Sequence, residues 1–277
     1  MNERVGGALR ARLQRLPDRV AAVGDPFDLH GHVALVTGGN SGIGLGMAEG
    51  LAAQGADVAI WGTNADKNTA AAEQLERHGT KVLSLICDVG DEAAVEESFA
   101  RTLDSLGKVD SCFANAGVSG NGSVFVDITA DEWHRVLRVN LDGVFYTLRA
   151  AVRHMVERGE GGSLAVTTSG SALMGAPRGQ PYASSKGAVI AMMKGIAVEH
   201  ARHGIRANAI LPGWIETPMT APAMGWDRFV DKVLPRVPMR RWGTGDDFSG
   251  IAVYLASDAS KYHTGDVLVL DGGYAIF

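Results

Sequence analysis

The chain has little cysteine, no excess of positive charge and no long apolar run. Only Cys87 and Cys112 occur among 277 residues, which excludes a disulfide framework or a cysteine-based zinc site. We expect both to be small buried side chains in a reducing compartment such as the cytoplasm. The net charge of −5 attracts no polyanion, so nucleic acid is not an expected partner. Apolar runs such as 33–36 are strand-sized, far below the roughly 20 residues of a membrane helix, so no membrane association is expected.

What the chain does contain, from about residue 30, is a regular alternation of strand-like and helix-like segments. The predicted strands are apolar almost throughout, as in a sheet covered on both faces: Val33–Thr37, Val58–Trp61, Val82–Cys87, Val109–Ala114, Ser163–Thr168, Arg206–Leu211 and Val267–Leu270. The predicted helices lie between them: Gly44–Gln54, Asp66–His78, Glu92–Leu106, Asp131–Arg158, Pro181–His203 and Gly245–Ala256. This order predicts one α/β domain, with a parallel sheet, right-handed crossovers and helices on both faces.

Two segments fall outside the alternation. Residues 1–26 lack the apolar core of a secretory signal, and we predict a short amphipathic or disordered arm, with an organelle transit segment as the alternative. Residues 214–241 fit no strand–helix unit. Their apolar side chains predict a substrate lid within a catalytic domain of residues 27–277, or else interface or core packing.

A glycine-rich loop joins the first predicted strand to the first predicted helix. In a doubly wound sheet this loop binds the pyrophosphate of a dinucleotide, because glycines allow close backbone approach and the helix start presents free N–H groups. We therefore predict NAD(P)(H) as cofactor, contacted by Gly38, Asn40, Ser41, Gly42, Ile43 and Gly44.

The ends of the next three strands supply further candidate contacts. An acid at the end of the second strand would bind the ribose hydroxyls and repel a 2′-phosphate, but the chain has none there. Thr63 and Asn64 could donate hydrogen bonds to such a phosphate, which favours NADP(H), or they could cap the next helix. Asp88, beside Val89, could accept a bond from the adenine amino group or cap a helix. The small residues Asn115-Ala116-Gly117 end the fourth strand.

A phenol and an ammonium four residues apart, Tyr182 and Lys186, would share one face of a helix. A cation about 4 Å away supplies roughly the 4 kcal/mol needed to lower the pKa of a phenol from about 10 to neutrality. The pair is therefore a plausible acid/base device. Ser169 ends the fifth strand and could bind the substrate oxygen, with Thr168 and Ser171 as rival hydroxyls. His200 and His203 have no evident third ligand, so we expect no metal site.

Taken together, the motifs Thr37-Gly38-x-x-x-Gly42-Ile43-Gly44, Asn115-Ala116-Gly117, Asn140, Ser169, Tyr182-x-x-x-Lys186 and Pro212-Gly213 resemble the short-chain dehydrogenase/reductase family. The resemblance implies a Rossmann fold with seven parallel strands and a homotetramer. It implies that Tyr182 is the acid/base, that Lys186 binds the nicotinamide ribose and lowers the phenol pKa, and that Ser169 orients the carbonyl. Asn140 would hold a water in the proton relay. Further implied coenzyme contacts are Pro212, Gly213, Ile215 and Thr217, with Trp214 at the substrate.

The function we expect is hydride transfer between NAD(P) and a small-molecule secondary alcohol or ketone. Alternatives within the same fold are a 3-oxoacyl thioester reductase and a sugar or polyol dehydrogenase. A protein that binds NAD(P) without turnover, as a regulator, would have no physical need for Asn140, Ser169, Tyr182 and Lys186 together.

Overall fold

A computed structural model describes residues 24–277, and most of the predicted N-terminal arm therefore lies outside the described residues. The strands form one sheet in the order β3-β2-β1-β4-β5-β6-β7, and every neighbouring pair is parallel. The predicted seven-stranded parallel Rossmann sheet is confirmed. Its strands are β1 (Val33–Thr37), β2 (Asp57–Gly62), β3 (Val82–Ile86), β4 (Ser111–Ala114), β5 (Gly162–Thr167), β6 (Ile205–Pro212) and β7 (Val267–Leu270).

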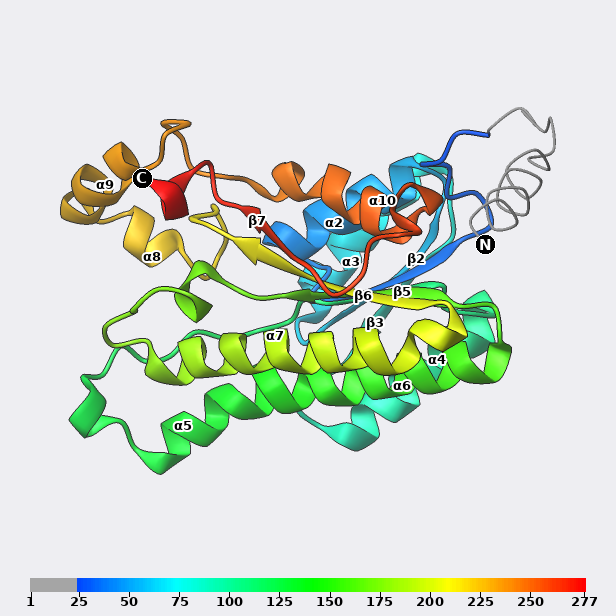
Figure 1. Ribbon diagram of the computed structural model, residues 1–277, viewed down its shortest axis with the longest axis horizontal. Helices are drawn as coiled ribbons and strands as arrows, with labels where there is room; N and C mark the ends of the chain where they lie inside the picture. Colours follow the sequence, from blue (N-terminus) through cyan, green and yellow to red (C-terminus); the bar gives the residue numbers. More distant parts are fainter. Residues whose placement is uncertain (1–23) are drawn as a thin grey trace, which may run out of the picture.

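Helices cover both faces of this sheet (Figure 1). On one face lie α2 (Gly42–Ala53), α3 (Ala65–Leu75) and α10 (Ser249–Ala256), and on the other lie α4 (Glu92–Leu106), α6 (Gly143–Arg158) and α7 (Gln180–His200). Because successive side chains of a strand point to opposite faces, Ala34 and Val36 of β1 pack with the first group and Leu35 with the second. Both faces are thus buried, which explains the unbroken apolar runs. Cys87 and Cys112 are buried free thiols, as expected.

The long helix predicted over Asp131–Arg158 is interrupted. It consists of α5 (Ala130–Leu137), a π-helical turn over Arg138–Asp142, and α6. A π-helical turn inserts one extra residue into a helix, so it rotates the side chains that follow, and such turns are frequent at functional sites. The 3.6-residue periodicity of the sequence continues on either side and does not reveal it.

The predicted lid is a separate excursion between β6 and α10. It contains the short helices α8 (Ala221–Met224) and α9 (Asp227–Val233). Its two ends meet in a bridge between Ile215 and Gly243, where Gly243 N donates to Trp214 O at 3.0 Å. The lid therefore stands beside the carboxyl ends of the strands with its base fixed (Figure 1). Within residues 24–277, none of the helices has both the length and the apolarity needed to cross a bilayer.

Candidate active site

A cleft of about 490 Å³ lies at the carboxyl ends of the strands, beside the neighbouring strands β1 and β4, whose following helices α2 and α6 lie on opposite faces of the sheet. Such a change of face between neighbouring strands is the position at which open α/β sheets bind ligands. All the residues predicted to contact the coenzyme line the cleft: Gly38, Asn40, Ser41, Gly42, Ile43, Gly44, Thr63, Asn64, Asp88, Val89, Asn115, Ala116, Gly117, Tyr182, Lys186, Pro212, Gly213, Ile215 and Thr217. Ser169 lines it as well.

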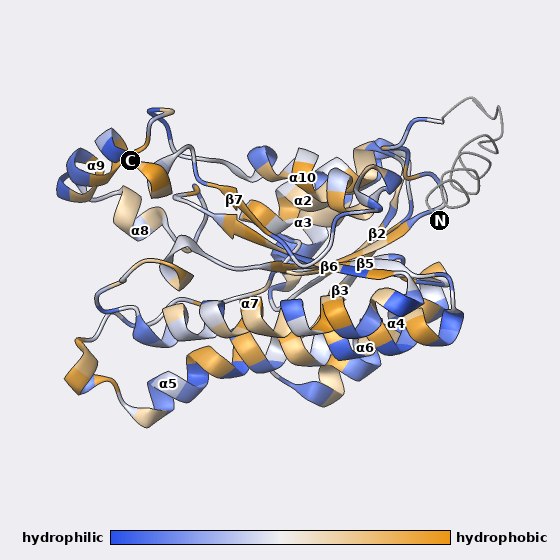
Figure 2. Ribbon diagram, in the orientation of Figure 1, coloured by the Kyte–Doolittle hydropathy of each residue, from blue (hydrophilic) through white to orange (hydrophobic). Residues whose placement is uncertain are grey.

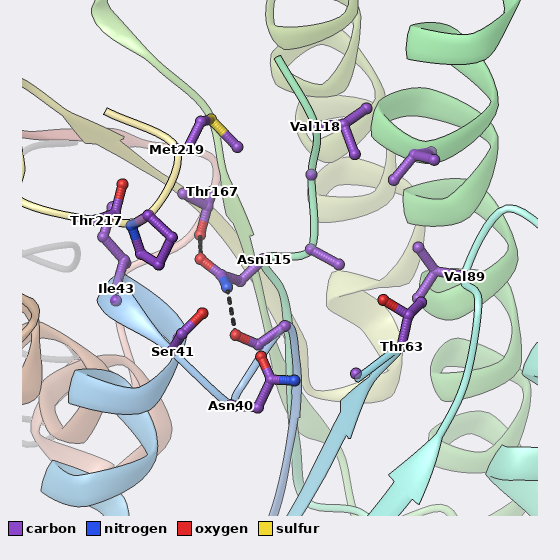
Figure 3. Close-up of a pocket in the computed structure, with 18 of the residues that line it drawn as sticks. Asn40, Ser41, Ile43, Thr63, Val89, Asn115, Val118, Thr167, Thr217 and Met219 are labelled. Carbon is purple, nitrogen blue, oxygen red and sulfur yellow. Dashed lines mark hydrogen bonds between the residues drawn. The ribbon is translucent and has the colours of Figure 1, made fainter. Parts of the chain in front are cut away.

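The glycine-rich loop leads from β1 straight into α2, whose first residue is Gly42. A Cβ on Gly44 would lie 2.2 Å from Gly38 O, so the loop closes only because residue 44 has no side chain. The resulting backbone turn places the free N–H groups at the start of α2 beside the cleft, which suits the pyrophosphate of a dinucleotide. Ser41, Ile43 and Thr217 surround this part of the cleft (Figure 3).

Asn115 connects three strand ends below the loop. Its Nδ2 donates to Thr37 O at 3.0 Å, and its Oδ1 accepts from Thr167 Oγ1, also at 3.0 Å (Figure 3). The hydroxyl of Thr37 accepts from the backbone N–H groups of Asn115 and Ala116. The side chain of Asn115 therefore holds β1, β4 and β5 together at the edge where the coenzyme would bind. The sequence analysis assigned no role to the side chains of Thr37 and Thr167, although both residues stand at predicted strand ends.

The adenosine end of the cleft contains both predicted and unforeseen groups. Asn64 caps α3, accepting from Lys67 N at 2.9 Å, so the capping alternative is confirmed for this residue. Asp88 accepts from Gly90 N at 2.9 Å and from Arg138 Nη1 at 2.9 Å. Arg138, which the sequence analysis missed, also lines the cleft. It comes from the π-helical turn, which no local signal predicted.

Tyr182 and Lys186 lie on one face of α7, with Lys186 Nζ 5.7 Å from the centre of the Tyr182 ring. Lys186 is buried, and its Nζ donates to Thr167 O at 2.8 Å. Because its charge is removed from water, the pKa of Lys186 falls from 10.5 to about 8. Burial raises the pKa of Tyr182, and a hydrogen bond with the Ser169 hydroxyl partly offsets this effect.

The pKa of the Tyr182 phenol is therefore raised, opposite to the lowering that the sequence predicted. Burial disfavours the phenolate, and the Lys186 ammonium is itself desolvated and directed at Thr167 O. Tyr182 is held as a neutral phenol, the form that donates a proton.

Ser169 follows β5, and the hydrogen bonds of Ser169, Thr168 and Ser171 distinguish these three candidate hydroxyls. Ser169 Oγ accepts from Ser171 N at 3.2 Å and from Ser171 Oγ at 3.0 Å, so its own proton is available to other groups. Thr168 Oγ1 is buried and donates to Lys186 O at 2.8 Å. Of the three candidate hydroxyls, Ser169 is the one that influences the pKa of Tyr182.

Neither Asn140, predicted to hold a water in the proton relay, nor Trp214, predicted at the substrate, is among the residues that line the cleft. Asn140 is fully buried in the π-helical turn, where its amide exchanges bonds of 2.8 and 2.9 Å with the backbone of Val118. These two bonds hold the loop that follows β4 in place. Trp214 turns away and packs edge-to-face on Phe229 of α9, with ring centres 4.8 Å apart. Met219 lines the cleft from the lid side, and Val118 from the β4 side.

Comparison with known proteins agrees with this geometry. A family model described as enoyl-(acyl carrier protein) reductase matches residues 38–275. Gluconate 5-dehydrogenase of Gluconobacter oxydans is 36% identical over 252 residues, 91% of this chain and 98% of that protein. The NADP-dependent (R)-specific alcohol dehydrogenase of Lentilactobacillus kefiri is 39% identical over 89% of this chain and 97% of its own length.

Solved structures agree as well. A short-chain type dehydrogenase/reductase from Mycobacterium marinum has a TM-score of 0.85 and 36% identity, over 90% of this chain and 98% of its own. A gluconate 5-dehydrogenase from Burkholderia cenocepacia in complex with NADP and tartrate has a TM-score of 0.86 and 36% identity, over 91% and 98%. The chain therefore belongs to the short-chain dehydrogenase/reductase family of NAD(P)-dependent oxidoreductases.

Proposed function

We propose that this chain interconverts a secondary alcohol and a ketone, using Tyr182 as the general acid/base. One observation carries the proposal: Ser169, Tyr182 and Lys186 converge in the same cleft as the glycine-rich loop. Two hydroxyls in one cleft can bind a single carbonyl oxygen, and the loop that lines the same cleft is shaped for a pyrophosphate. A protein that merely binds the coenzyme would not need the hydroxyl pair.

The residues act as follows in the direction of ketone reduction. The hydroxyls of Ser169 and Tyr182 bind and polarise the carbonyl oxygen. The coenzyme, when bound, supplies the hydride to the carbonyl carbon. Tyr182 donates its phenolic proton to the oxygen, and the phenolate so formed is stabilised by the nearby Lys186 ammonium, 5.7 Å from the ring centre. Alcohol oxidation reverses these steps, with Tyr182 accepting the proton.

The experiment follows NADPH absorbance with a panel of ketones, sugars and 3-oxoacyl thioesters. Replacing Tyr182 with Phe should reduce turnover by about 10²–10⁴-fold, the usual contribution of general acid–base catalysis, while coenzyme binding persists. Tyr262→Phe, at a fully exposed tyrosine, is the matched control and should keep full activity. Unchanged turnover in the Tyr182→Phe protein would rule out this function.

For the coenzyme we favour NADP(H). No acidic side chain occupies the end of β2, and Lys67 lines the adenosine end of the cleft. A 2′-phosphate carries negative charge, so it gains from a nearby ammonium and loses from a carboxylate. The Lentilactobacillus relative is named as NADP-dependent, and the Burkholderia structure contains NADP. Titrations with NADPH and NADH test this preference directly.

Among substrates, an apolar ketone or secondary alcohol fits better than a polyol. Val118 and Met219 line opposite sides of the cleft (Figure 3) that also contains Ser169 and Tyr182, and polar hydroxyls placed against them would lose hydrogen bonds to water. The gluconate relatives keep the sugar alternative open as an outcome of the substrate panel.

We also propose that the enzyme is a cytoplasmic homotetramer. The buried free thiols support a reducing compartment. A largely apolar groove runs between α6 and α7, two helices whose ribbons carry several hydrophobic positions in Figure 2, and an identical groove on a second copy could cover it. The apolar residues lining it are Phe145, Leu148, Val152, Val156, Met192 and Ile196. Light scattering coupled to size-exclusion chromatography measures the assembly.

A further inference from the structure

The end of β2 is occupied in a way that leaves no room for a side chain. A Cβ on Gly62, the last residue of the strand, would lie 2.2 Å from Asn40 Nδ2 and 2.5 Å from Asn68 Oδ1. Contacts this short are not tolerated between atoms that are not bonded. Thr63 and Asn64, the next two residues, line the adenosine end of the cleft. The two amides therefore fill the space where a side chain of residue 62 would begin.

Asn68 is the rigid member of this amide pair. It is 3% exposed, and its Nδ2 donates to Gly62 O at 3.1 Å and to Leu85 O at 2.9 Å. Both of its N–H bonds are thus used by carbonyl groups, and a reversed amide would place Oδ1 against two carbonyl oxygens. Its Oδ1 must consequently face the other way, towards Asn40.

The orientation of Asn40 follows from that of Asn68. Asn40 Nδ2 donates to Asn68 Oδ1 at 2.7 Å. Because only the nitrogen of Asn40 can meet an acceptor, its amide orientation is determined as well. Asn40 itself lines the cleft, whereas Asn68 lies behind it.

The consequence concerns charge at the ribose of the coenzyme. A carboxylate at this strand end would accept bonds from the ribose hydroxyls and repel a 2′-phosphate. The amide pair keeps such a side chain out and leaves two uncharged groups in its place, with the Lys67 ammonium on the same side of the cleft. A phosphate can then bind without facing a negative charge.

We propose that Asn40 and Asn68 together determine the coenzyme preference of this enzyme, Asn40 by direct contact and Asn68 as the positioning residue. The proposal rests on the proposed oxidoreductase function. It also explains why residue 62 has neither an acidic nor a basic side chain, because the space is already taken.

The test compares four full-length proteins: the unchanged chain, Gly62→Asp, Asn40→Ala/Asn68→Ala, and the triple variant. Dissociation constants for NADPH and NADH are measured by fluorescence titration without substrate, and Tm is measured for each protein. Gly62 O keeps its bond from Cys87 N when Asn68 is removed, which supports folding of the double variant. Thr69→Ala, at the neighbouring exposed position of α3, is the matched control and should leave the coenzyme ratio within twofold.

We expect Gly62→Asp to lower Tm by several degrees more in the otherwise unchanged chain than in the double variant. In the double variant the amides of Asn40 and Asn68 are gone, so the new side chain has room. In the triple variant the preference should shift towards NADH by at least tenfold. An equal loss of Tm in both backgrounds, or a full shift caused by Gly62→Asp alone, overturns the proposal. If the double variant fails to fold, Gly62→Asp with and without Asn40→Ala decides. The Asn40→Ala background should relieve part of the Tm loss and shift the preference towards NADH, and a Tm loss and a coenzyme ratio that are both the same in the two backgrounds overturn the proposal.

The outcomes also separate this inference from the proposed function. An unchanged chain that binds neither coenzyme contradicts the oxidoreductase function itself. A chain that binds both, with a ratio insensitive to these substitutions, contradicts only the role of the amide pair.

Discussion

Replacing Lys186 with Met should change how the stability of the coenzyme-free protein depends on pH. Lys186 is 3% exposed, and burial lowers its pKa from 10.5 to about 8. The difference of about 2.5 units, at about 1.36 kcal/mol per unit, means that the fold disfavours the ammonium by about 3 kcal/mol relative to the unfolded chain. Methionine has a similar length and carries no charge, so the variant lacks this titration.

The direction of the effect follows from which state holds the proton. Between pH 8 and 10.5 the folded protein has released the Lys186 proton while the unfolded chain retains it, so raising the pH favours the folded state. The cost of burying the ammonium is about 3 kcal/mol at pH 7 and falls to about 1.4 kcal/mol at pH 9.5. The unchanged protein should therefore gain about 2 kcal/mol over Lys186→Met across this interval.

Urea unfolding at pH 7 and pH 9.5, followed by circular dichroism, measures this gain. Groups remote from residue 186 titrate alike in both proteins, so the difference between the two curves isolates the contribution of Lys186 and of its contact with Tyr182. Lys194→Met, at an exposed position on the same helix, is the control and should show no comparable change. A difference between Lys186→Met and the unchanged protein that is flat with pH, or that moves the other way, would refute the reasoning about the buried ammonium.

Three further predictions address the sheet edge, the base of the sheet and the substrate. Asn115→Ala should cost about 2–3 kcal/mol of unfolding free energy, because two bonds at 3.0 Å are lost and Thr167 Oγ1 loses its acceptor; a loss below 0.5 kcal/mol by urea unfolding would contradict this. Burial raises the pKa of Asp110, but the Val33 N–H and cations such as Arg158 lower it overall. Asp110→Asn should therefore lower the free energy of unfolding by about 3–5 kcal/mol near neutrality. The difference in stability between the two proteins should shrink as the pH falls through the lowered pKa of Asp110, which thermal unfolding from pH 7 to pH 3 can follow. The kcat/KM for a keto ester should be at least about tenfold higher than that for the free keto acid. Met219→Lys should lower this ratio of ester to acid, and equal kcat/KM values for the two substrates in the unchanged protein would argue against an apolar substrate.

The sequence by itself determined those features that depend on the local spacing of residues: the strands, the glycine-rich loop and the pairing of Tyr182 with Lys186. Apolar runs predicted strands because both faces of the sheet are covered, and a glycine-rich loop after the first strand placed the coenzyme cleft. Tyr182 and Lys186 are four positions apart in a helix, so their common face was assured before any tertiary contact. The carboxyl ends of parallel strands share one edge, which explains why the predicted contacts from 38 to 217 line a single cleft.

Only the tertiary structure decided the properties that depend on partners far apart in the chain. The raised pKa of Tyr182 follows from burial, and the spacing of residues along the chain carries no information about desolvation. Asn140 meets Val118 because a π-helical turn rotates it inward, and Asn68 meets Asn40 because the ends of β1 and β2 lie side by side. Spacing along a chain places side chains on a face, whereas orientation, hydrogen-bond partner and charge state are set by whatever the rest of the fold packs against them.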